Sequence, residues 1–136
     1  MEKRGKSPTI LVADDLAIIR ELVATCLRVR GYDVLCAADG IEALKLVRAH
    51  YPDLIVCDIS MPEMNGIAFL EHLRADSKTV QTPVILLTGS SDKTLMHRAA
   101  ELGVSDYLLK AGFSVAALID RVKKILSATT IQAGEF

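Results

Sequence analysis

Short apolar runs alternate with segments of helical period along the chain. Five runs are rich in Val, Ile and Leu and do not alternate in polarity: residues 9–13, 33–37, 54–57, 83–87 and 106–109. Continuous apolar runs of this length are typical of strands that are buried on both faces of a parallel sheet. After each run, apolar residues recur three and four positions apart, which predicts five amphipathic helices.

The helix boundaries follow from local start and stop signals. The first helix is predicted over residues 16–30, because Gly31 provides a stop. Ser91 or Asp92 is the expected N-cap of the fourth helix, and Ser114 that of the fifth. The apolar positions that define the later helices are Ile41, Leu44 and Val47, then Ile67, Leu70 and Leu73, then Leu95, Ala99 and Leu102, and finally Val115, Leu118, Ile119, Val122 and Leu126.

Strict alternation of strands and helices predicts an α/β fold, with one doubly wound parallel sheet covered by helices on both faces. The ligand site of such a sheet lies outside the carboxyl ends of its strands. The predicted domain covers residues 9–126. Residues 1–8 and 127–136 are polar with little periodicity, so we expect two flexible tails, the second of which would be a natural tail or a cloning remnant.

Length and charge narrow the classes of function. The 136 residues suit one domain, and 16 basic against 17 acidic side chains give a net charge of -1, which argues against direct nucleic-acid binding. No apolar run approaches the roughly 20 residues that span a bilayer. Cys26, Cys36 and Cys57 show no C-x-x-C spacing, so we expect buried reduced thiols in a cytoplasmic protein.

Acidic side chains follow two strands that a doubly wound sheet makes neighbours. Asp14 and Asp15 end the first strand, and Asp58 ends the third. Three converging carboxylates would repel one another, and a hard divalent cation such as Mg²⁺ relieves that repulsion. The alternative is that Asp14 or Asp15 only caps the following helix. The third carboxylate, at the equivalent place on another strand, favours the metal site.

A hydroxyl and an ammonium follow two further strands. Thr88 ends the fourth strand, and Lys110 follows the fifth. A metal, an ammonium, a hydroxyl and backbone N–H groups together suit a phosphoryl group. The acids would not bind phosphate themselves, but one of them could be the group that becomes phosphorylated.

These residues, in this order, resemble the receiver domain of two-component response regulators, the family of the single-domain chemotaxis regulator. The resemblance covers residues 9–126 and implies a flavodoxin-like strand order of 2-1-3-4-5. Its markers are Asp14-Asp15, Asp58, the Met-Pro-Glu-Met-Asn-Gly turn at residues 61–66, Thr88, and Tyr-Leu-Leu-Lys at residues 107–110.

The resemblance implies a phosphoryl-transfer site. Asp58 would accept a phosphoryl group from a sensor histidine kinase or a histidine phosphotransfer protein. Asp15 and Asp58 would bind Mg²⁺ directly, together with the backbone carbonyl of Ser60. Asp14 would act through a bound water. Lys110 would pair with Asp58 or with a phosphoryl oxygen. The chain would then be a signalling domain that catalyses only its own phosphorylation and dephosphorylation.

The resemblance also implies a switch. Thr88 would hydrogen-bond a phosphoryl oxygen, and Tyr107 would change rotamer as Thr88 moves inward. The altered surface over the fourth helix, fifth strand and fifth helix would then bind a downstream partner, or a second copy through its fourth-helix–fifth-helix face. A packed strand aromatic remains an equally good interpretation of Tyr107.

The sequence departs from the family after Lys110. The family has Pro at the next position, joined by a cis bond, whereas Ala111 and Gly112 stand here before Phe113. A cis bond before Ala would cost about 2.5–4 kcal/mol, so we expect either a trans bond with a rebuilt loop or a cis bond held by its surroundings. The reach of Lys110 depends on the outcome.

Three other functions are weighed against this one. A phosphatase with an aspartyl nucleophile needs a second Asp two residues after the first, where Ser60 stands. A flavodoxin-like cofactor module needs a phosphate-binding loop where Asp14 and Asp15 would repel phosphate. A receiver-like interaction module that works without phosphorylation remains open, because of the altered loop after Lys110.

Overall fold

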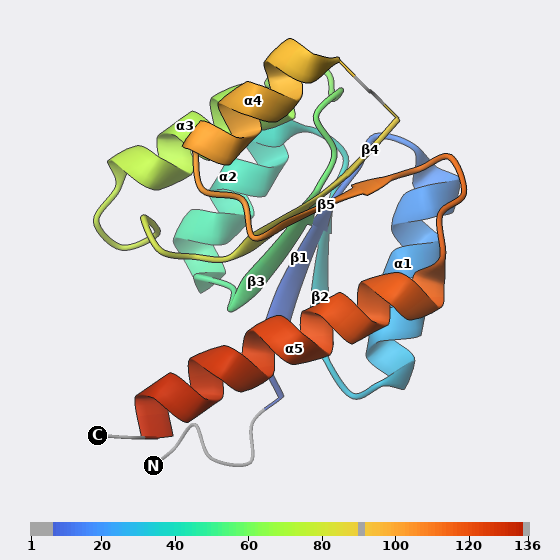
Figure 1. The fold of residues 1–136 in the computed structure, drawn as a ribbon, viewed down its shortest axis with the longest axis vertical. Helices are drawn as coiled ribbons and strands as arrows, with labels where there is room; N and C mark the ends of the chain where they lie inside the picture. The colour runs from blue at the N-terminus through green and yellow to red at the C-terminus, as the bar shows by residue number, and fades with distance from the viewer. Residues whose placement is uncertain (1–6, 90–91, 135–136) are drawn as a thin grey trace.

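The computed structural model describes residues 7–89 and 92–134. Its five strands form one parallel sheet in the order β2-β1-β3-β4-β5 (Figure 1). The strands are β1 (Thr9–Ala13), β2 (Asp33–Ala37), β3 (Leu54–Cys57), β4 (Val84–Thr88) and β5 (Asp106–Leu109). This is the predicted strand order, so the α/β class and the doubly wound sheet are confirmed.

Five helices cover the two faces of the sheet (Figure 1). Helices α2, α3 and α4 lie on one face, and α1 and α5 lie on the other. Their bounds are α1 (Ala17–Val29), α2 (Gly40–His50), α3 (Gly66–Ala75), α4 (Lys93–Glu101) and α5 (Val115–Gly134). None of the helices among the described residues combines the length and the apolar character needed to cross a membrane.

Alternate residues of each central strand belong to different cores. In β1, Ile10 and Val12 pack toward α1 and α5, whereas Leu11 and Ala13 pack toward the other three helices. The same division holds in β3 and β4. Because both faces are covered, a polar side chain has no place within these strands, and the apolar runs in the sequence are continuous.

Local signals set the starts of α4 and α5. The carboxylate of Asp92 accepts hydrogen bonds from the backbone N–H groups of Thr94 and Leu95, so it is the N-cap of α4. The alternative cap, Ser91, lies outside the described residues. The hydroxyl of Ser114 accepts from the backbone N–H of Ala117 at 3.2 Å, as expected for the start of α5.

Helix α1 is one residue shorter at each end than predicted, and boundaries of β4 and α5 also differ from the structure. The strand β4 begins at Val84, because the preceding Pro83 has no backbone N–H to donate to the sheet. Helix α5 continues to Gly134, beyond the predicted domain end at residue 126. Those residues contain neither Pro nor Gly before Gly134, and a helix that is already nucleated extends at little cost. Residues 1–6 and 135–136 lie outside the described residues.

The three cysteines are free, but only Cys57 is fully buried. Burial raises the pKa of the Cys57 thiol above its ordinary value, and the same cause raises the pKa of Cys36. Cys26 and Cys36 are half-buried, on α1 and β2. Complete burial, which was expected for all three cysteines, holds for Cys57 alone.

Two glycines let the loop between β3 and α3 pack closely. A Cβ on Gly66 would overlap the backbone carbonyl oxygen of Asp58 and would lie 2.8 Å from the Cα of Ile59. A Cβ on Gly40 would overlap the carbonyl oxygen of Met64. The backbone N–H of Gly66 also donates to the carbonyl of Ile59 at 2.7 Å. The loop therefore folds back against the end of β3, where Asp58 lies.

We expect Gly66→Ala to lower the free energy of unfolding by roughly 1–3 kcal/mol, because the new methyl group would push the backbone of Asp58 aside. Denaturant unfolding measures the change. Gly89→Ala is the matched control, since a Cβ there meets nothing within 4 Å. Equal stability of the two variants would contradict the close packing at Gly66.

Candidate functional site

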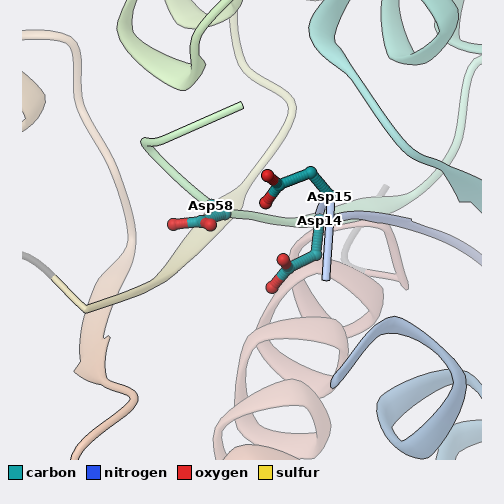
Figure 2. Close-up of side chains that lie close together, drawn as sticks. All are labelled: Asp14, Asp15 and Asp58. Atoms are coloured by element: carbon teal, nitrogen blue, oxygen red, sulfur yellow. The ribbon is translucent and has the colours of Figure 1, made fainter. Parts of the chain in front are cut away.

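Three carboxylates meet at the carboxyl ends of β1 and β3 (Figure 2). The two strands are neighbours, and their last residues, Ala13 and Cys57, are paired in the sheet. The next residues are therefore brought together: Asp14 and Asp15 after β1, and Asp58 after β3. One oxygen from each carboxylate lies within 4.8 Å of the other two. Asp14 and Asp58 are buried, at 2% and 4% exposed, while Asp15 is exposed.

One ammonium group is shared by the two buried carboxylates. Lys110 follows β5, and its side chain is 15% exposed. Its Nζ lies 3.0 Å from Oδ2 of Asp58, and 2.9 Å and 3.1 Å from Oδ2 and Oδ1 of Asp14. The predicted convergence of Asp14, Asp15, Asp58 and Lys110 at this edge of the sheet is what the structure has.

Burial and ion pairing shift the pKa values of Asp58 and Lys110 in opposite directions. Burial raises the pKa of the Asp58 carboxyl, the hydrogen bond and charge of Lys110 oppose that shift, and the charge of Asp14 adds to it. Burial alone would lower the pKa of the Lys110 ammonium, but its hydrogen bonds to Asp14 and Asp58 outweigh burial, and the pKa is raised. Lys110 is therefore charged at neutral pH, whereas the ionised form of Asp58 is disfavoured.

The donor set fits a hard divalent cation. Carboxylate oxygens are ligands that Mg²⁺ prefers, and it is commonly held by one or two of them. The buried Oδ2 of Asp14 accepts no hydrogen bond from the described residues and has only the nearby charge of Lys110. A cation beside the three acids would satisfy that oxygen and reduce the repulsion. Asp14, Asp15 and Asp58 are the side chains that could hold it.

Asp14 also organises the turn between β1 and α1. Its Oδ1 accepts a hydrogen bond from the backbone N–H of Leu16 at 2.9 Å. The alternative that Asp14 or Asp15 only caps the following helix is wrong, because Leu16 is the N-cap of α1 and no side chain caps that end. The sequence analysis missed Arg20, whose Nη1 donates to the backbone carbonyl of Asp14 at 2.8 Å. Nothing in the sequence separates it from the solvated basic residues of α1.

The loop after Asp58 is tightly turned. The backbone N–H of Met64 donates to the carbonyl of Pro62 at 2.7 Å, and Glu63 between them has a φ of 66°. This is the geometry of a γ-turn, which is rare for residues other than Gly. Ser60 is exposed, and its backbone N–H donates to Oδ1 of Asp58 at 3.4 Å.

The two residues of the expected switch lie on the next strands. Thr88 is fully buried at the end of β4, where its carbonyl accepts from the backbone N–H of Lys110 at 2.8 Å. Tyr107 is half-buried in β5 and packs against the core under α2, α3 and α4. Burial raises the pKa of its phenol. Thr88 is therefore bonded to the backbone of Lys110, and Tyr107 lies three residues before Lys110.

Comparison with known proteins decides the family. A sequence model of the response regulator receiver domain matches residues 10–123. The chain belongs to this family. The receiver domain of the Francisella response regulator 1452 has 36% identity and a TM-score of 0.81, covering 90% of this chain and 99% of that one. The chemotaxis protein CheY4 of Vibrio cholerae has 30% identity and a TM-score of 0.80, covering 87% of this chain and 98% of that one.

Curated relatives of this receiver domain are longer proteins. The probable transcriptional regulator ycf27 of Porphyridium aerugineum is 41% identical over 117 residues, which are 86% of this chain and 47% of that protein. The regulator of RpoS of Escherichia coli strain K12 is 40% identical over 101 residues, which are 74% of this chain and 29% of that protein. The chain spans about half the length of the first of these relatives and less of the second.

The turn after Lys110 differs from the family pattern, but the ammonium reaches the acids. No cis peptide bond occurs among the described residues, so the bond between Lys110 and Ala111 is trans. The backbone N–H of Phe113 donates to the carbonyl of Lys110 at 3.1 Å, and Gly112 has a φ of 73°. A positive φ at the third position of a four-residue turn requires Gly in type II turns. In this receiver domain, residues 110–113 therefore form a turn whose geometry requires Gly112.

We expect Asp58→Asn to make the metal-free receiver domain more stable at pH 7, because it removes a buried charge beside Asp14. The pKa of Asp58 is higher in the folded state than the ordinary value of about 3.9, so wild-type stability falls as pH rises through the window between the two. The advantage of the variant should vanish below pH of about 4 and grow as pH rises through the raised pKa.

Thermal unfolding of both proteins in a chelating buffer, over a series of pH values, measures this difference. Asp76→Asn is the control, since Asp76 lies in the loop after α3, away from the acidic cluster. A pH-independent difference between wild type and Asp58→Asn would contradict the argument.

Proposed function

We propose that this receiver domain is a phosphorylation switch with Asp58 as the phospho-acceptor. An oxygen of the Asp58 carboxylate would attack the phosphorus of a phosphohistidine on a sensor histidine kinase or a histidine phosphotransfer protein. The new O–P bond would form as the P–N bond breaks. The imidazole nitrogen would leave with the electron pair of that bond.

The position of Lys110 carries this proposal. Its ammonium touches both buried carboxylates, at 3.0 Å from Asp58 and 2.9 Å from Asp14. A structural ion pair would need only one acid, and the second leaves the cluster with an excess of negative charge. An ammonium beside the acceptor oxygen is placed to bind a phosphoryl oxygen and to stabilise the charge that moves during transfer.

Mg²⁺ is the cofactor that the carboxylates suit. Asp15 and Asp58 would bind it directly with the backbone carbonyl of Ser60, and Asp14 would act through a water. When bound, the ion would spread the negative charge of the acids and of the phosphoryl oxygens. Lys110 would remain available to a phosphoryl oxygen, because it is a separate cation on a different strand.

Thr88 and Tyr107 are the proposed readout. Thr88 ends β4 and pairs with Leu109 of β5, and Tyr107 packs against the core that contains α4. A phosphoryl group brings added charge and three strong acceptor oxygens. A hydroxyl that moves toward these oxygens would leave space for Tyr107 to turn inward. This would change the surface over α4, β5 and α5 for a downstream partner or a second copy of the chain.

The relatives suggest the kind of output. One is named a probable transcriptional regulator and another a regulator of RpoS. We infer that the chain controls gene expression through a partner or through a further domain, since neither nucleic-acid binding nor catalysis of another reaction is supported by its own charge and site. Its three free cysteines support a cytoplasmic location.

We expect the protein to acquire one phosphoryl group when it is incubated with a small acyl phosphate and Mg²⁺, as measured by intact mass. Asp58→Asn should acquire none, because an amide is a poor nucleophile. Chelation of Mg²⁺ should abolish the adduct in the wild type. A wild type that stays unmodified, with Mg²⁺ bound, would overturn the phosphorylation switch and favour an interaction module that works without phosphorylation.

We expect Lys110→Met to form the adduct about 10²-fold more slowly, a typical effect of removing one group that stabilises developing charge. Magnesium binding should be kept or strengthened in this variant, because the ammonium no longer competes for Asp14 and Asp58. Lys124→Met is the control, since Lys124 is an exposed residue of α5 that pairs with Asp120. An adduct rate equal to that of Lys124→Met would remove Lys110 from the mechanism.

A further inference from the structure

We propose that Arg20 is a positioning residue that holds the turn carrying Asp14 and Asp15 from its backbone side. This rests on the proposed function, because the turn matters most if it presents two of the acids to Mg²⁺. Arg20 lies at the end of the first turn of α1, and its side chain is 18% exposed. Its guanidinium touches no carboxylate oxygen of the acidic cluster that the structure describes.

Both the backbone and the side chain of Arg20 bond to the turn. Nη1 donates to the carbonyl of Asp14 at 2.8 Å, and the backbone N–H donates to the carbonyl of Leu16 at 2.9 Å. A hydrogen bond from a charged donor is shorter and stronger than one between neutral groups. The carbonyl of Asp14 is therefore fixed to the same helical residue that closes the first turn of α1.

Other support for the turn comes from the neighbouring strand β2 and from the side chain of Asp14. Leu16 is the N-cap of α1, and no side chain caps this end of the helix. The backbone N–H of Asp14 donates to the carbonyl of Ala37 at 3.0 Å, and the N–H of Leu16 donates to Oδ1 of Asp14. That same carboxylate also pairs with Lys110 and faces the proposed cation. A carboxylate that also binds Lys110 and a cation can stabilise the turn less than one that accepts only from the N–H of Leu16.

Arg20 stabilises the turn through a backbone carbonyl and not through a carboxylate. Its contact to the Asp14 carbonyl occupies none of the three carboxylates, so all of them stay available to a cation. On the solvent side, its Nε lies 3.9 Å from the carboxylate of Glu21, which offsets part of its charge. The favourable contribution of Arg20 is therefore the orientation of the peptide between Asp14 and Asp15, which must outweigh the repulsion between its own charge and a bound cation.

The test is the dissociation constant of Mg²⁺, measured by titration calorimetry on the unphosphorylated chain. We expect Arg20→Ala to bind Mg²⁺ about 10-fold more weakly, within the range found when a residue that orients metal ligands is removed. Arg20→Lys should recover part of the affinity, since it keeps one charged donor. The ratio between wild type and Arg20→Ala should persist when the salt concentration is raised, because a hydrogen bond is not screened.

Arg28→Ala is the matched control. Arg28 lies on the same helix and also donates from its guanidinium to a backbone carbonyl, that of Val34 at 3.1 Å, but at the edge strand β2. The Arg28→Ala substitution removes the same charge and the same kind of contact as Arg20→Ala. The Mg²⁺ affinity of Arg28→Ala should therefore stay at the wild-type value. Unfolding of each variant without Mg²⁺ shows whether the fold persists. Should Arg20→Ala fail to fold, Arg20→Lys alone must weaken Mg²⁺ binding relative to wild type.

The outcomes separate this proposal from the proposed function. Wild-type affinity in Arg20→Ala, equal weakening in Arg28→Ala, or a ratio that collapses at high salt would each overturn the positioning role, while adduct formation on Asp58 would stand. A wild type that binds Mg²⁺ but forms no adduct would overturn the phosphorylation switch, while weaker binding by Arg20→Ala would still support positioning. A wild type that binds no Mg²⁺ would overturn both.

Discussion

The confinement of like charges at one edge of the sheet is the constraint on which the site depends. Asp14 and Asp58 are almost completely buried, and each follows a strand whose side chains pack on both faces. Neither acid can move into water without disturbing the sheet. Their repulsion is opposed by the ammonium of Lys110, which reaches them from the end of β5. Two carboxylates and one ammonium leave an excess of negative charge, so the structure favours any further cation at this edge.

The fold and most of the site could be predicted because they follow from the same rule. Strands buried on both faces leave continuous apolar runs in the sequence, and those runs end where polar groups begin. Asp14, Asp58, Thr88 and Lys110 stand at these ends, so finding the strands located the chemistry. The features that the sequence did not predict lie outside the strands, where no continuous apolar run marks them. The sequence around Ser127 has weak periodicity, yet α5 continues through it, since nothing there interrupts a helix. The guanidinium of Arg20 reaches back to a carbonyl, which depends on a rotamer that no spacing reveals.

The position of the Lys110 ammonium depends on the pairing of β4 with β5 and not on the turn that follows Lys110. The backbone N–H of Lys110 donates to the carbonyl of Thr88, so the residue is still held by the ladder between β4 and β5. The direction of its side chain is set there, before the turn begins. Ala111 and Gly112 change the path toward α5 but come after this point. A turn rebuilt around Gly112 therefore leaves Nζ within 3.1 Å of both acids.

The same confinement explains how one covalent change could alter a distant surface. A phosphoryl group would raise the charge on Asp58 from about -1 to between roughly -1.5 and -2, next to Asp14 and Asp15. The acids cannot separate, because the strands that carry them are packed on both faces. The groups that can respond are those at the rim: the ammonium of Lys110, a bound cation and the hydroxyl of Thr88. The carbonyl of Thr88 accepts from the backbone N–H of Lys110, and Tyr107 lies in β5, the strand that Lys110 follows. A response to phosphorylation would therefore be directed along β5 toward α4 and α5, rather than into the centre of the sheet.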